Sequence, residues 1–177
     1  VETLPDGTRF LVHLCHSEDN QCDKECVKAG INAALQRLSD RTRQLRFAGG
    51  VNTLSDAQLD YLASLDNKDR LAWCAHEEGG GLNAGAGIAR YVRLPDEPDE
   101  PDEPDVAEFA ITIVDAFQGR GLGRILLGHL IESARENGIR ILRGYVLPGN
   151  NAMLHLGKQF DARIEYEDSV LRVDIPV

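Results

Sequence analysis

A glycine-rich turn, Gln118-Gly119-Arg120-Gly121-Leu122-Gly123, has the residue types and spacing best suited to chemistry in this chain. An apolar run that reads as a strand precedes it, and a helical pattern follows it directly. Backbone N–H groups at a helix start are unpaired, and the helix dipole favours negative charge there. Glycines let a phosphate approach those amides, and Arg120 and Arg124 could add positive charge. The turn therefore predicts a pyrophosphate site; the alternative is a tight turn whose glycines serve backbone geometry alone.

Two familiar phosphate-binding motifs do not fit this turn. A dinucleotide fingerprint needs G-x-G-x-x-G, and here the third glycine comes one residue early. A nucleoside-triphosphate loop needs Gly-Lys followed by Ser or Thr, which the turn lacks. The spacing is instead Q-x-x-G-x-G, from Gln118 through Gly121 to Gly123.

The elements that must position this turn follow from hydrophobic periodicity and turn residues. The pattern predicts one mixed α/β domain over residues 1–177, with the element order β-α-α-β-β-β-α-β-α-β-β. Ser55 and Gln58 have the spacing of a capping box, and Asp168-Ser169 is predicted to turn the last two strands into a hairpin. The predicted strands are 9–14, 71–75, 85–92, 107–114, 141–147, 163–166 and 170–175, and the predicted helices begin near residues 27, 55, 124 and 151.

Charge is the unusual part of the composition. The 177 residues carry a net charge of −10, and the run DEPDEPDEPD over 96–105 contributes seven carboxylates and no basic residue. Without that run the net charge would be −3. An acidic chain disfavours a general nucleic-acid binder and a polybasic membrane-surface protein. With no stretch of ~20 apolar residues and no signal-peptide pattern, we expect a cytoplasmic protein without a membrane partner.

The cysteines raise the question of a metal site. Cys15, Cys22, Cys26 and Cys74 are too few and too scattered for a disulfide scaffold, so we expect reduced thiols. Cys15, His16, Cys22 and Cys26 could supply four soft ligands to zinc. The paired C-x2-C spacing is absent, however, and we expect no metal.

Five consecutive segments resemble the GNAT family of acetyl-CoA-dependent N-acetyltransferases. Across residues 107–160 these are AEFAITIV, QGRGLG, RILLGHLIESARENG, ILRGYVL and PGNNAMLHL. The QGRGLG and NNAML segments, together with LSDRTRQLRF over 38–47, are most similar to the bacterial protein-lysine acetyltransferase branch. The resemblance implies a central, mostly antiparallel sheet of about six to seven strands flanked by helices, and acetyl-CoA as the co-substrate.

The resemblance also implies a set of cofactor contacts. The amides of Gly119 to Gly123, and with them Arg120, Leu122 and the flanking Gln118 and Arg124, would hold the CoA pyrophosphate. Backbone groups of Ile111 and Ile113 would pair with the pantetheine arm as an extra strand does. Asn150 would contact the cofactor from the start of the last helix.

A base is needed as well, because a protonated amine cannot attack a thioester. Glu108 matches the position of a general-base glutamate in protein-acetylating relatives; the alternative is an ordinary solvated carboxylate at a strand start. The chain departs from the family pattern further on. Leu156 stands where many members have a tyrosine acid, His155 is expected at the surface, and Asp161-Ala162 replaces a frequent Gly-Phe.

These features predict direct acetyl transfer from acetyl-CoA to a primary amine, either a protein lysine or a small molecule. The alternatives are a non-catalytic acyl-CoA-binding regulatory module and an interaction protein whose acidic run mimics a polyanion. The partner we expect is a cationic amine acceptor, and the resemblance implies that two copies can form a homodimer. The acidic run over 96–105 ends shortly before Glu108, which suggests that it steers cationic acceptors; the alternative is a solubilising loop.

Overall fold

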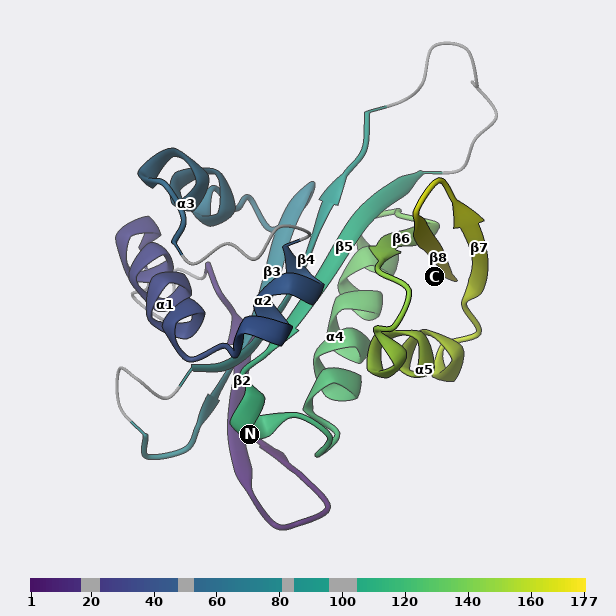
Figure 1. Ribbon diagram of the computed structural model, residues 1–177. Coiled ribbons are helices and arrows are strands. Elements are labelled where there is room, and N and C mark those ends of the chain that lie inside the picture. Colours follow the sequence, from purple (N-terminus) through teal and green to yellow (C-terminus); the bar gives the residue numbers. More distant parts are fainter. Residues whose placement is uncertain (17–22, 48–52, 81–84, 96–104) are drawn as a thin grey trace.

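Strands from the whole length of the chain form one mixed sheet (Figure 1). The computed structural model describes residues 1–16, 23–47, 53–80, 85–95 and 105–177, and within these the sheet has eight strands in the order β1-β2-β3-β4-β5-β6-β8-β7. Neighbours pair antiparallel except β5 and β6, which pair parallel. The strands are β1 Glu2–Thr3, β2 Arg9–Leu14, β3 Arg70–Glu77, β4 Gly85–Arg93, β5 Val106–Ile113, β6 Ile141–Val146, β7 Arg163–Glu167 and β8 Val170–Pro176.

Helices cover both faces of this sheet (Figure 1). Helix α4 packs against β3, β4 and β5, whereas α1 packs against β4 and α3. Polar side chains begin the N-terminal helices: Asp23 caps α1, Ser39 caps α2, and Ser55 forms the predicted capping box with Gln58 at α3. The helices are α1 Lys24–Gln36, α2 Asp40–Arg46, α3 Asp56–Ala63, α4 Leu122–Glu136 and α5 Asn151–Gln159, with a 3-10 turn, η3, at Asp115–Phe117.

The predicted class, a mixed α/β fold, is confirmed, and the element count is slightly higher than predicted. The two-residue strand β1 adds to the expected six or seven strands, and it is too short to give a periodic signal. Helix α2 separates from α1 because Ser39 caps a new helix immediately after Leu38. The β7–β8 hairpin turns at Asp168-Ser169 as predicted. Among the described helices, none is long and apolar enough to cross a membrane.

The prediction of reduced thiols is wrong for two of the four cysteines. Cys15 and Cys74 form a disulfide with a Cα–Cα distance of 5.4 Å. The bond joins positions 59 residues apart, and only the pairing of β2 with β3 brings them together. Because Cys15 is bonded to Cys74, it is not available as a thiolate ligand for zinc. Cys26 is exposed on α1, and Cys22 lies outside the described residues.

The parallel strands β5 and β6 diverge in the middle of the sheet. They pair only from Val106–Ile141 to Glu108–Arg143, although both strands continue beyond these pairs. Just past the last pair, the buried ring of Phe109 lies against Gly144, where a Cβ would come within 2.9 Å of the ring. Phe109 thus packs against Gly144 at the point where the pairing of β5 with β6 ends.

The contact between Phe109 and Gly144 gives a first testable prediction. Gly144→Ala forces the buried ring to move, and overpacking of this kind costs about 1–3 kcal/mol in the free energy of unfolding. Urea denaturation measures this loss. Gly128→Ala in α4 is the matched control: no atom lies within 4 Å of its added methyl group, so a gain of about 0.5–1 kcal/mol is expected. Equal stability of Gly144→Ala and the wild type would contradict the close packing of Phe109 on Gly144.

Candidate acetyl-CoA and acceptor site

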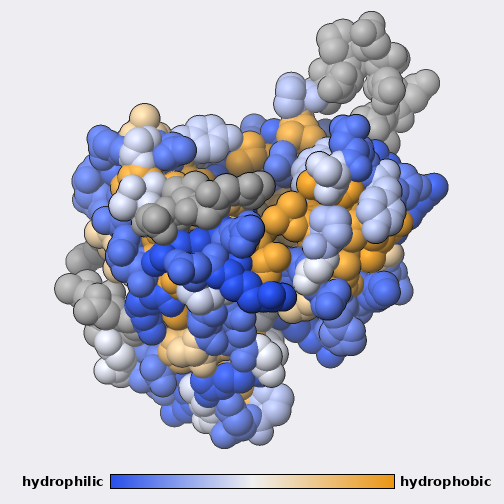
Figure 2. Space-filling view, viewed as in Figure 1, coloured by the Kyte–Doolittle hydropathy of each residue, from blue (hydrophilic) through white to orange (hydrophobic). Residues whose placement is uncertain are grey.

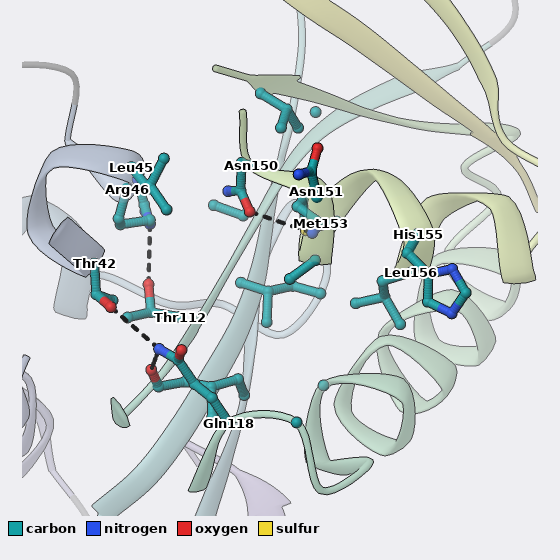
Figure 3. Close-up of a pocket in the computed structure, with 18 of the residues that line it drawn as sticks. Thr42, Leu45, Arg46, Thr112, Gln118, Asn150, Asn151, Met153, His155 and Leu156 are labelled. Carbon is teal, nitrogen blue, oxygen red and sulfur yellow. Dashed lines mark hydrogen bonds between the residues drawn. The ribbon is translucent and has the colours of Figure 1, made fainter. Parts of the chain in front are cut away.

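A cleft of about 730 Å³ lies where β5 and β6 diverge. Its walls come from α2, the second half of β5, the glycine turn, the start of α4, the end of β6 and α5 (Figure 3). Figure 2 shows apolar side chains gathered near the centre of this face, between the more polar surfaces on either side. The cleft therefore combines an apolar interior with polar groups at its two ends.

The glycine turn presents unpaired amides to one end of the cleft. Gly119 and Gly121 have φ values of 71° and 98°, in the left-handed region that favours glycine. Gly121 is the N-cap of α4, with no side-chain cap and no acidic residue in the first turn. No atom lies within 4 Å of a Cβ built on Gly119. The first-turn N–H groups therefore face space that an anion can occupy, so the residues present fit a pyrophosphate.

Some side chains of the glycine turn line the cleft, whereas others contact the rest of the protein. Gln118, Gly123 and Arg124 line the cleft. The guanidinium of Arg120 instead pairs with Asp6 at 2.8 Å and donates a hydrogen bond to Thr8, and the bond from Arg120 holds the pKa of Asp6 well below its usual range. Leu122 is buried and does not line the cleft. These two residues therefore have only backbone groups to offer the predicted cofactor.

Gln118 holds the turn in place. Its Nε2 donates to the carbonyl of Ile113 at 3.0 Å and to Oγ1 of Thr42 at 3.2 Å (Figure 3). The Thr42 hydroxyl in turn donates to Asp115 in η3. One amide side chain thus ties the glycine turn to β5 and α2, which gives the first position of the Q-x-x-G-x-G motif a structural role.

The backbone of β5 presents polar groups to the cleft at odd-numbered residues. Leu94 N–H bonds to Val106 C=O, and Val114 N–H bonds to Ala86 C=O, so even-numbered residues of β5 bond to β4. The groups of Ile111 and Ile113 consequently face the β6 side, where the ladder has already ended at Glu108. The Ile113 carbonyl accepts from Gln118, whereas Ile111 offers its N–H and C=O to the cleft. This edge can pair with an extended polar chain, as the predicted pantetheine contact requires.

Asn150 lies across the cleft at the start of α5. It is the N-cap of that helix, and its Oδ1 accepts a hydrogen bond from the Met153 N–H at 3.2 Å (Figure 3). His155 and Leu156 also line the cleft, and His155 is exposed as predicted. The predicted contact of Asn150 with the cofactor stays a prediction.

Glu108 lies at the other end of β5 from the glycine turn. Its side chain is exposed, and it stands just outside the lining of the cleft, which begins at Phe109. Arg46 of α2 approaches the same sheet face: its Nε donates to Oγ1 of Thr112 at 3.1 Å. Burial lowers the pKa of Arg46, and the charge of Glu108 acts in the opposite direction.

Three polar side chains that line the cleft, Thr42, Arg46 and Tyr145, were not identified from the sequence pattern. Thr42 and Arg46 come from the 38–47 segment, whose resemblance to relatives was the only signal for them. Tyr145 lines the cleft from β6, and burial, with Glu167 and Glu108 nearby, raises the pKa of its phenol. A phenol that remains protonated at neutral pH is a hydrogen-bond donor at this end of the cleft.

The sheet is open between two parallel strands, the uncapped start of α4 lies at one end of the cleft, and Glu108 lies just outside its other end. This geometry can accommodate an extended anionic ligand. The comparisons with known proteins agree. The model of the acetyltransferase (GNAT) family matches residues 33–161, and the chain belongs to this family. It is an acetyl-CoA-dependent N-acetyltransferase.

Two curated relatives are similar over most of the chain. Acetyltransferase PA5475 of Pseudomonas aeruginosa is 33% identical over 156 residues, which are 88% of this chain and 76% of the relative. Acetyltransferase Pat of Mycolicibacterium smegmatis is 34% identical over 85% of this chain, but the match spans only 43% of that longer protein.

Solved structures show the same fold. The GNAT domain of S. lividans PAT superposes with a TM-score of 0.82 at 26% identity, covering 99% of this chain and 95% of that one. A cAMP-binding acyltransferase from Mycobacterium smegmatis gives a TM-score of 0.61 at 27% identity, with 99% of this chain and 46% of the other covered.

Proposed function

We propose that this protein transfers the acetyl group of acetyl-CoA to the side-chain amine of a protein lysine, with Glu108 as the general base. The proposal rests on the order in which three groups lie along β5. The uncapped start of α4 lies beyond one end of the strand, the open backbone edge of Ile111 is in its middle, and Glu108 is near the other end. An extended cofactor whose phosphates bind at the start of α4 would place its thioester toward Glu108.

The residues have distinct roles in this reaction. Glu108 accepts a proton from the ammonium form of the acceptor, so that a neutral nitrogen attacks the thioester carbonyl. A backbone N–H of β5 stabilises the negative oxygen of the tetrahedral intermediate. The new bond joins nitrogen to the acetyl carbon, the carbon–sulfur bond breaks, and coenzyme A leaves as a thiolate. The attacking nitrogen loses its extra proton to give the amide, and the thiolate takes up that proton.

The choice of a protein lysine rests on the resemblance of three segments to the bacterial protein-lysine branch. These segments are 38–47, QGRGLG and NNAML, and the first contributes Thr42 and Arg46 to the cleft. A small-molecule amine is the alternative acceptor. Release of free thiol from acetyl-CoA, measured with a panel of lysine peptides and small amines, tests both. Binding of acetyl-CoA without amine-dependent release would instead support a non-catalytic acyl-CoA-binding module.

The acidic run gives a second prediction, although residues 96–104 lie outside the described part of the chain. At its described end, Asp105 pairs with Arg93 at 2.9 Å. Replacing the six carboxylates of 96–104 by their amides keeps the length and removes only charge. If the run steers cationic acceptors, kcat/KM at low salt should fall about tenfold, with kcat unchanged.

Salt supplies the control for this experiment. Electrostatic steering is screened, so the variant and the wild type should converge above about 0.5 M salt. Equal kcat/KM at low salt would identify the run as a solubilising segment.

A further inference from the structure

A second, smaller cavity lies beside the cleft, on the sheet face that α1, α2 and α3 cover. Its volume is about 60 Å³, several times what one water needs. Arg46 and Thr112 line both spaces, so the small cavity adjoins the cleft at these two residues. Most of its other walls are apolar, formed by Ile31, Leu35, Leu38, Phe47, Leu54 and Leu62.

A buried arginine of β4 lines this apolar cavity. Arg90 is only 6% exposed, and its Nη1 donates to the Leu62 carbonyl at 3.1 Å. Its Nη2 is buried and has no hydrogen-bond partner. Burial, together with the charges of Arg46 and Arg70, lowers the pKa of Arg90 to about 10. Within the described residues, Arg90 forms no ion pair with a carboxylate.

This arrangement is unfavourable for the protein alone. A buried cation without a carboxylate partner among the described residues carries a large desolvation penalty, and two more cations nearby add repulsion. A bound anion would remove both costs, because a carboxylate accepts two hydrogen bonds from a guanidinium. The cavity therefore has volume for a carboxylate group beside the guanidinium groups of Arg90 and Arg46, and Nη2 of Arg90 becomes its hydrogen-bond donor when the carboxylate binds.

The register of the sheet relates this cavity to the predicted base. Arg90 pairs directly with Ala110, and Glu108 stands two residues earlier on the same face of β5. Two residues of an extended strand span about 7 Å. A single acceptor molecule could place its amine at Glu108 and a carboxylate at Arg90.

We propose that Arg90, with Arg46, binds a carboxylate carried by the amine acceptor. The proposal rests on the proposed acetyl transfer and narrows its substrate class to amines that carry a carboxylate a few ångströms from the reacting nitrogen. That carboxylate could be the α-carboxylate of a free amino acid or an acidic side chain beside a peptide lysine. Both are recognised by the same two guanidinium groups.

Matched pairs of acceptors test the proposal and distinguish the two sources. The first pair is Nα-acetyl-lysine and its amide; the second is a capped lysine peptide with a neighbouring Glu or Gln. The wild type should prefer the carboxylate member of one pair about tenfold in kcat/KM, mainly through KM. Arg90→Met should reduce the ratio of the two kcat/KM values to about one. Arg90→Lys keeps the positive charge but cannot donate two parallel hydrogen bonds, so its ratio should be intermediate. No preference in either pair, or a preference that survives Arg90→Met, would overturn the proposal.

Thermal stability separates a binding role from a structural one. If Arg90 is retained for a ligand, Arg90→Met removes an unpaired buried charge, and Tm should stay the same or rise. A fall of more than about 5 °C would indicate that Arg90 supports the fold. In that case Arg90→Lys is the deciding variant. If it folds like the wild type and lowers the carboxylate preference by at least about threefold, the proposal is supported; a smaller change contradicts it.

Measuring how tightly the reaction products bind tests the carboxylate site without relying on enzymatic turnover. Calorimetry compares the acetylated forms of the same two pairs, as carboxylates and as amides, in the presence of coenzyme A. One outcome is that no amine is acetylated, yet one carboxylate product binds to the wild type about tenfold more tightly than its amide and loses this advantage in Arg90→Met. That outcome would support the carboxylate site at Arg90 and contradict the proposed acetyl transfer. If all four amines are acetylated at equal rates, acetyl transfer stands and the anion site fails.

Discussion

Glu108→Gln is expected to lower kcat for amine acetylation by about 100- to 10,000-fold at neutral pH, the usual contribution of a general base. The amide keeps the size of the side chain and loses the ability to accept a proton. Glu108 lies outside the lining of the cleft, at the opposite end of β5 from the glycine turn, so the Kd for acetyl-CoA should stay within about twofold. Thiol release at saturating amine measures the first quantity, and calorimetry measures the second.

The pH profile of this variant provides an independent check. Without a base, the enzyme depends on acceptor that is already neutral, and an unperturbed lysine has a pKa of about 10.4. The residual rate should therefore rise about tenfold for each pH unit up to that value. Glu132→Gln, on the exposed side of α4, is the matched control and should behave as the wild type. An unchanged kcat for Glu108→Gln at saturating amine would remove Glu108 from the mechanism.

The second large effect is expected at the helix start. Gly121→Val places a β-branched side chain at a φ of 98°, where L-residues are strained by about 1–3 kcal/mol. The turn can relieve that strain only by rotating the amides that face the cleft. Loss of the pyrophosphate contacts should raise the Kd for acetyl-CoA about 10- to 100-fold.

Gly79→Val is the matched control for this strain. Gly79 has a φ of 82°, lies in the turn after β3, and has no atom within 4 Å of an added Cβ. It should lose a similar amount of stability in urea denaturation and leave the Kd for acetyl-CoA unchanged. If both variants bind acetyl-CoA as the wild type does, the amides of the glycine turn do not hold the cofactor.

Local signals explain why much of the fold was predictable. Alternation located the strands to within a few residues, the Ser55–Gln58 spacing identified a capping box, and Asp168-Ser169 marked the last hairpin. The Q-x-x-G-x-G turn is also local: strand, glycines and helix are contiguous in the chain, so the cradle at the start of α4 can be inferred from neighbouring residues. These features depend on propensity and short-range hydrogen bonds, which the sequence records directly.

Contacts between distant segments were not predictable in the same way. The disulfide of Cys15 with Cys74 depends on the β2–β3 register, and the position of Arg46 beside Thr112 depends on how α2 packs on β5. Arg120 has the composition of a phosphate ligand, yet its guanidinium pairs with Asp6, more than a hundred residues earlier. In each case the partner is chosen by tertiary packing, which leaves no periodic or spacing signal.

The sequence by itself determined the class of the fold, the glycine turn that starts α4 and the family to which the chain belongs, because each is written in contiguous residues. Only the tertiary structure decided where β5 and β6 separate, just past the Glu108–Arg143 pair, with the ring of Phe109 packed against Gly144. It also decided that Arg90 of β4 is buried with an unpaired Nη2 beside Arg46. The physical reason is that burial and charge proximity are properties of packed surfaces, and the residues that form these surfaces come from strands and helices far apart in the chain.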